Sequence, residues 1–244
     1  ENVKKKINIW EDISLNYNGR TYGILHLEEI YKVNKKDMAQ KIFGTADILH
    51  PGVKKFLDYK EYFLGGKITL LKKRNYLHNI YDLTPRQTRK IFSEKGWSKI
   101  IGFHTRNVIH RSHEFIQMEG MKRGLCDGLF VHPIIGKKKT GDFEADIIMK
   151  SYEKMIEEFY PKSKVILGAF SNYSRYCGPR EAVFTAIVRK NFGCSHFIVG
   201  RDHTGVGNFY SGDASHKIFD SFSKEELGIE PIFFDNVFTS SLFL

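Results

Sequence analysis

The chain has 244 residues, of which 41% are hydrophobic and 14% aromatic, and its formal net charge at pH 7 is +10. This composition is typical of a folded, well-packed protein and excludes a disordered chain. No apolar run approaches the roughly 18 residues that a membrane-spanning helix needs, so we expect no membrane partner. The three cysteines are widely separated, which argues against a disulfide framework and a CxxC metal site and favours a reducing, cytoplasmic compartment.

Residues 1–81 are predicted to form a small β-rich unit. The pair Asn18–Gly19 is a hairpin-turn signal, and the alternating pattern after it is typical of a strand. The segment 35–44, KKDMAQKIFG, has helical spacing and ends at Gly44, a common helix stop. Residues 50–71 then predict a short helix, a turn at Gly65–Gly66 and another strand.

From residue 82 onward the pattern changes to strands that alternate with helices. Thr84 is an N-cap signal, Pro85 suits the first helical position, and Gly96 ends that helix. Further strands are expected at 99–103, 128–135, 164–170 and 195–200, and further helices at 110–124, 142–160 and 178–193. This alternation predicts a doubly wound α/β domain with a parallel sheet over residues 82–244.

Polar segments follow the ends of several of these strands, among them FHTRN (103–107) and VGRDH (199–203). Ligands of open α/β sheets bind at the carboxyl ends of the strands. We therefore expect one crevice to gather six charged or imidazole side chains: His104, Arg106, His110, His113, Arg201 and His203.

His110 and His113 stand at the start of a predicted helix, one turn apart and on one face. The positive end of a helix, with its free N–H groups, suits a polyphosphate. Two histidines one turn apart also suit zinc, but no third ligand follows at a familiar spacing, and Arg106 and Arg111 would repel a cation. Anion binding, a structural pair and a metal site thus remain as alternatives for these two residues.

Other motifs are weaker. The segment GRDHTG (200–205) follows a strand, and Gly200 allows the backbone to approach a ligand closely. GPRE (178–181) opens a helix, which a structural cap also explains. The sequence contains neither the phosphate-binding GxxxxGK[ST] loop nor a GxSxG nucleophile motif.

Five segments in order resemble one family: HPGV (50–53), LTPRQTRKIFSEKGW (83–97), TRNVIHRSHEFIQ (105–117), VHPIIGKKKTGD (131–142) and the run from GPRE to GNFY (178–210). They are similar to sulfate adenylyltransferase (ATP sulfurylase), and the likeness extends from about Gly19 to about Phe234. It implies a PUA-like domain at residues 1–81, followed by an α/β nucleotidyltransferase domain at 82–244. Relative to the family, the start of the first domain and the region after the catalytic core are expected to be missing.

The resemblance implies transfer of AMP from ATP to sulfate with Mg²⁺ and release of pyrophosphate, as in sulfate assimilation. It implies that Arg106 holds the acceptor oxyanion and that Asn107 contacts the nucleotide phosphates. His110 and His113 would stabilise the α-phosphorus and the departing pyrophosphate. The nucleotide side of the cleft would also contain Gly200, Arg201, Asp202 and His203.

This chain departs from the family pattern on the acceptor side. His104 stands where the family has Gln, Thr204 stands where it has Ala, and Val108 stands where it has Pro. An imidazole adds a possible charge or a proton acceptor. Thr204 adds a hydroxyl that could donate to an additional oxygen of the acceptor or occupy the space of that oxygen. We therefore expect His104, Arg106 and Thr204 to bind the acceptor.

Two other functions stay open at this stage. One is the same nucleotidyl transfer to a phosphonate or phosphate ester, and the other is a non-catalytic RNA-binding role for a PUA-like, basic protein. We consider nucleic acid an unfavoured partner, because no stripe of alternating basic and aromatic residues is present. Small-molecule substrates are the expected partners, and a homo-oligomer is left open.

Overall fold

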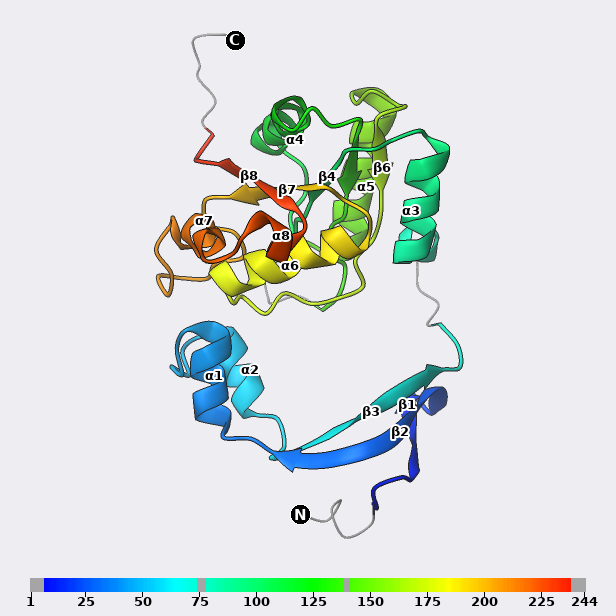
Figure 1. Ribbon diagram of the computed structural model, residues 1–244, viewed down its shortest axis with the longest axis vertical. Coiled ribbons are helices and arrows are strands. Elements are labelled where there is room, and N and C mark those ends of the chain that lie inside the picture. Colours follow the sequence, from blue (N-terminus) through cyan, green and yellow to red (C-terminus); the bar gives the residue numbers. More distant parts are fainter. Residues whose placement is uncertain (1–6, 74–77, 138–140, 238–244) are drawn as a thin grey trace. The chain divides into compact units, whose positions relative to one another are not determined.

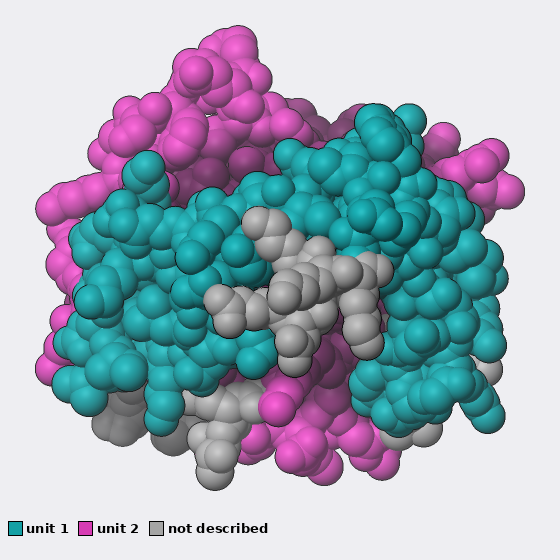
Figure 2. All heavy atoms as spheres, turned by 90° about the horizontal axis from the view of Figure 1, so that it is seen from below, with its two compact units in different colours: residues 1–76 teal, residues 77–244 magenta. Residues whose placement is uncertain are grey.

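The computed structural model describes residues 7–73, 78–137 and 141–237. Its contacts divide the chain into two compact units, residues 1–76 and 77–244, which are coloured separately in Figure 2. Each unit has a sheet of its own among the described residues, with three strands in the first unit and five in the second (Figure 1).

The sheet of the first unit is antiparallel, with strands β1 (Asp12–Tyr17), β2 (Arg20–Lys32) and β3 (Tyr62–Leu70) in that spatial order. The predicted hairpin between β1 and β2 is confirmed. Its two turn residues, Asn18 and Gly19, have φ values of 47° and 71°. Two successive positive φ values match the right-handed twist of the flanking strands, which is why Asn-Gly is favoured there.

Two helices connect β2 to β3. Helix α1 (Lys35–Phe43) begins at Asn34, whose side chain accepts hydrogen bonds from two backbone N–H groups, and it ends at the left-handed Gly44, as predicted. Helix α2 (Pro51–Leu57) is capped by the ring of His50, whose Nδ1 accepts from the backbone of the first turn at 3.1 and 3.2 Å.

The predicted turn at Gly65–Gly66 is wrong, because both glycines lie inside β3. They pair with β2 at an irregularity in the register between Leu27 and Glu29. The chain reversal is made earlier, by the two helices. The glycines serve the bulge instead: Gly66 has a φ of 155°, and a Cβ there would lie 1.9 Å from the carbonyl oxygen of His26.

The substitution Gly66→Ala is expected to destabilise the first unit by about 3 kcal/mol, because the clashing atom belongs to a paired strand and cannot move away. Gly44→Ala is the matched control, because Gly44 also has a positive φ of 72° but no atom within 4 Å of the added carbon. It should cost only about 1 kcal/mol. Urea denaturation measures both, and equal losses would contradict the steric explanation.

The second unit is a five-stranded sheet in the order β6-β5-β4-β7-β8, and all its strand pairs are parallel. Its strands are β4 (Ile100–Phe103), β5 (Gly128–Val131), β6 (Val165–Leu167), β7 (His196–Gly200) and β8 (Glu230–Phe234). Its helices are η1 (Asn79–Tyr81), α3 (Pro85–Glu94), α4 (Arg111–Arg123), α5 (Ala145–Glu158), α6 (Pro179–Asn191), α7 (Ala214–Lys217), η2 (Ile218–Ser221) and α8 (Lys224–Leu227). The predicted α/β class with a parallel sheet is confirmed, while β8 and the short helices before it were not predicted.

Alternation along the strands places a hydrophobic core on each face of this sheet. Ile101 and Phe103 of β4 belong to one core, together with residues of α5 such as Met149. Ile100 belongs to the other core, together with residues of α6 such as Ala186. Because successive side chains of a strand point to opposite faces, a strand buried on both sides reads as a continuous apolar run.

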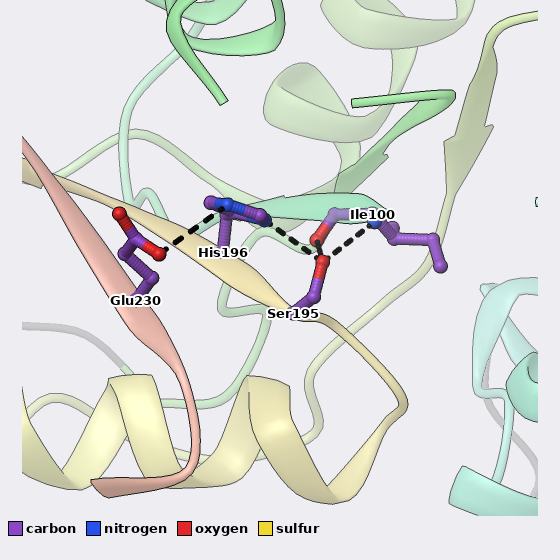
Figure 3. Close-up of polar contacts among 4 residues, drawn as sticks. All are labelled: Ile100, Ser195, His196 and Glu230. Atoms are coloured by element: carbon purple, nitrogen blue, oxygen red, sulfur yellow. Dashed lines mark hydrogen bonds and ion pairs between the residues drawn. The ribbon is translucent and has the colours of Figure 1, made fainter. Parts of the chain in front are cut away.

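A histidine, a serine and a glutamate meet at the amino ends of β4, β7 and β8 (Figure 3). The Ser195 hydroxyl accepts from the Ile100 N–H at 3.0 Å and lies 2.8 Å from Nδ1 of His196, whose Nε2 is 3.9 Å from Glu230. The serine oxygen is thus occupied by the backbone of the neighbouring strand. We interpret this cluster as an anchor between β4 and β7, at the sheet edge opposite to the strand ends where ligands bind.

No helix in the described part of the chain has both the length and the apolar content needed to cross a membrane. The three cysteines are free, and two of them, Cys177 and Cys194, are buried. Burial raises the pKa of both thiols to about 12, which makes them poor nucleophiles.

Candidate active site

The order of the strands places a topological switch point between β4 and β7. From β4 the chain adds β5 and β6 on one side of the sheet, and then returns to add β7 and β8 on the other side. The loops that leave the carboxyl ends of β4 and β7 therefore diverge and open a crevice between them. These two loops begin at His104 and at Arg201.

A cavity of about 170 Å³ lies at this crevice. Its lining combines apolar strand and helix residues with polar residues of the two loops: Phe103, His104, Thr105, Arg106, Asn107, His113, Ile116, Ile198, Gly200, Asp202, His203 and Thr204. Among these the single carboxylate belongs to Asp202, which is exposed. The remaining polar groups favour a negatively charged ligand.

Eight residues singled out from the sequence line this cavity together: His104, Arg106, Asn107, His113, Gly200, Asp202, His203 and Thr204. His110 and Arg201 do not line it. The His110 ring stacks on His113 with 3.7 Å between ring centroids, so it acts on the cavity through its neighbour. The exposed Arg201 side chain donates from Nε to Asn236 at 3.0 Å.

The first turn of helix α4 offers free backbone donors next to the cavity. Its N-cap is His110, and the His110 side chain makes no capping hydrogen bond. The first N–H groups of a helix have no partner inside the helix, and they carry the positive end of its dipole. Because α4 has 13 residues and brings His113 into the cavity lining, its amino end is suited to phosphate.

Arg106 is the cation best placed for an oxyanion. Its Nη1 atom is buried and has no hydrogen-bond partner within the described residues. Its guanidinium lies over the ring of Tyr176, 5.1 Å from the ring centroid, and this contact restrains the orientation of the guanidinium plane. A buried donor without a partner is costly, which makes this guanidinium a candidate for binding an anion.

Thr204 has a strained backbone, with a φ of 56° that β-branched residues rarely adopt. Its hydroxyl lies 2.7 Å from the carbonyl oxygen of His203 and 3.4 Å from that of Gly178. The hydroxyl hydrogen is therefore directed to the backbone, and the sequence-based idea that it donates to an acceptor is not favoured by this geometry.

The imidazoles around the cavity are kept neutral. Burial lowers the pKa of His203 to about 3, with a smaller contribution from Arg189 and Arg106. Burial and then the neighbouring His110 lower the pKa of His113 to about 4. Neutral rings donate hydrogen bonds without repelling one another, and an incoming polyanion can later stabilise a protonated form.

Two buried polar residues next to the cavity were not recognised in the sequence. Arg189 of α6 and His132, which follows β5, are both fully buried. The available signal for Arg189 was its position: it follows Thr185 and Ala186 at helical spacing, on the face that α6 buries against the sheet. A charged residue on an apolar helix face is unusual enough to be noticed, but the pattern does not reveal what the residue contacts.

Within the described ranges, no group of three or more His, Cys, Asp or Glu side chains is arranged to hold a metal ion. Asp202 is therefore the one carboxylate of the lining that could approach a cation carried by a ligand.

Comparison with known proteins identifies the family of the second unit. A family model described as ATP-sulfurylase matches residues 79–240, and a model described as a PUA-like domain matches residues 1–73. The chain belongs to the ATP-sulfurylase family. The predicted family and the PUA-like character of the first unit are thereby confirmed.

Relatives of this ATP-sulfurylase family chain include sulfate adenylyltransferases from Synechococcus sp. (strain JA-3-3Ab), 47% identical over 224 residues, and from Ignicoccus hospitalis, 44% identical over 238 residues. These alignments cover 91% and 98% of this chain, but only 56% and 61% of the relatives. A solved structure of a hexameric APS kinase from Thiobacillus denitrificans matches with a TM-score of 0.69 and 19% identity, over 96% of this chain and 39% of that one. At this identity the likeness concerns the fold alone.

Proposed function

We propose that this chain transfers AMP from ATP to sulfate and releases pyrophosphate. The observation that carries this proposal is the meeting of Arg106, His113 and the uncapped start of α4 around one cavity at the switch point, in a member of the ATP-sulfurylase family. The chain spans 56% of the length of its Synechococcus relative. The activity is proposed for the 244-residue chain and not for a longer protein.

In the proposed reaction a sulfate oxygen attacks the α-phosphorus of ATP. The new P–O bond forms as the bond to the pyrophosphate oxygen breaks, and the electron pair leaves with pyrophosphate. Sulfate carries no hydrogen, so no base is needed. The protein has to hold the two anions in line and to stabilise the charge that builds up on the leaving group.

The residues divide into two sides. Arg106 would bind the sulfate, and Asn107 would contact the nucleotide phosphates. His113, supported by the stacked His110, would donate to the departing pyrophosphate together with the start of α4.

On the nucleotide side, Gly200 would let the backbone approach the nucleotide, with Asp202 and His203 beside it. Arg201 remains a proposed nucleotide contact that would first have to release Asn236. Mg²⁺ would enter with ATP as part of the substrate.

The test is pyrophosphate release by the chain with ATP and Mg²⁺, supplied with sulfate, selenate, phosphate or methylphosphonate. We expect release with sulfate and selenate. Release with methylphosphonate alone would support a different acceptor, and a silent enzyme that binds RNA in a filter assay would favour the non-catalytic role. A homo-oligomer, as in the hexameric structural neighbour, can be measured by light scattering on the same sample.

A further inference from the structure

Arg189 is a fully buried cation without a carboxylate partner among the described residues. Its Nη2 donates to the carbonyl oxygen of His132 at 2.7 Å and to Nδ1 of His104 at 2.8 Å. Its guanidinium also lies over the Phe170 ring, 4.9 Å from the centroid. A buried charge without an ionic partner lowers the stability of the folded chain. Its presence at Arg189 therefore points to a functional role for this residue.

The contact with Arg189 decides which nitrogen of His104 carries the hydrogen. A guanidinium has five N–H donors and no acceptor, so Nδ1 of His104 must accept and cannot itself be protonated. Burial, and then the positive charge of Arg189, hold the pKa of His104 well below its usual range. The ring is therefore neutral, and its single N–H is at Nε2.

His104 lines the cavity beside Arg106, and the hydrogen bond found for its ring among the described residues is at Nδ1, not at Nε2. The neighbouring Thr204 hydroxyl is directed to backbone carbonyls. The Thr204 oxygen can still accept through its lone pairs, so the side-chain donors at this edge of the cavity are Arg106 and the Nε2–H of His104.

We propose that Arg189 is a positioning residue that locks His104 in the Nε2–H tautomer, and that His104 so held donates a hydrogen bond to the acceptor oxyanion. This inference rests on the proposed function, in which a sulfate oxygen is the group that accepts from Nε2 of His104.

The tautomer is measured without any substrate. In a chain labelled with ¹⁵N-histidine, His104 should show an unprotonated Nδ1 and a protonated Nε2 between pH 6 and 8, its signals being assigned by their loss in His104→Gln. In Arg189→Lys the signals should move toward a mixture of the two tautomers. A protonated Nδ1 in the parent chain, or an unchanged ratio in Arg189→Lys, would overturn the proposal.

The role toward the acceptor is measured by steady-state kinetics. Loss of a buried donor in His104→Leu should raise the KM for sulfate about 10- to 100-fold, with the KM for ATP nearly unchanged. His104→Gln can accept from Arg189 through its carbonyl and still present an N–H, so its KM for sulfate should stay within about 3-fold of the parent. A sulfate KM unaffected in His104→Leu would contradict the donor role.

Arg89→Lys is the matched control for Arg189→Lys. Arg89 donates to the carbonyl oxygens of Lys190 and Asn191 at the end of the same helix, but it does not contact His104. It should change neither the tautomer signals nor the KM for sulfate. If the parent chain shows the predicted tautomer but no sulfate-dependent release, the proposed function fails while the lock stands; if it is active with the wrong tautomer, the lock fails alone.

Discussion

Replacing Arg106 with alanine is expected to lower kcat/KM for sulfate by about 1000-fold, the loss typical of a charged group that holds a reacting anion. The structure gives the reason: Arg106 lines the cavity, and its buried Nη1 has no hydrogen-bond partner among the described residues. Pyrophosphate release over a range of sulfate concentrations measures the effect, while binding of an ATP analogue should weaken by less than about 10-fold.

The control for this substitution is Arg86→Ala. Arg86 is exposed in the first turn of α3, and its replacement removes the same unit of positive charge without altering the cavity. Its kinetics should match those of the parent chain. A comparable loss in Arg86→Ala would mean that net charge, and not the placement of Arg106, governs the reaction.

The second large effect is loss of stability in mild acid. Burial is the main cause that lowers the pKa of five histidines in the second unit: His104, His113, His132, His196 and His203. In the unfolded chain each has a pKa near 6.5. Below about pH 6.5 these histidines are protonated in the unfolded chain but still neutral in the folded chain. This difference persists until the pH reaches the pKa values of the folded chain, which are about 4 for His113 and about 3 for His203.

The stability of the folded chain therefore decreases as the pH is lowered. These neutral rings contribute stability that is fully present above about pH 6.5 and is lost as the pH falls toward about 4. The free energy of unfolding should fall by up to about 1.4 kcal/mol per pH unit for each of these histidines. Urea denaturation at pH 7, 6 and 5 measures the slope, and equal stability at pH 7 and pH 5 would refute the account.

His132→Phe tests the same account at one residue. The His132 ring packs among Phe130, Phe170 and Phe192, with centroids 4.5, 5.2 and 4.6 Å away. A phenyl ring of similar size cannot be protonated, so the pH slope of the variant should be smaller than that of the parent chain. An unchanged slope would assign the acid sensitivity to other groups.

Much of the fold could be predicted because its signals are local. The start of α3 is an example: Thr84 and Gln87 form a reciprocal cap with Pro85 between them, and all three residues are close in the sequence. The turn at Gly65–Gly66 failed for the opposite reason. A glycine pair permits a turn, but it equally permits a bulge against a strand, and only the pairing of β3 with β2 distinguishes the two.

The amino-acid sequence was sufficient for the family, the parallel sheet and the cluster of His104, Arg106 and His113 at the strand ends, because in a parallel sheet those ends meet at one edge. What His104 presents to a ligand depends instead on the folded chain. Its hydrogen is placed by Arg189, 85 residues away along the chain. A tautomer depends on the partner that folding brings to one ring nitrogen, and no local pattern contains that partner.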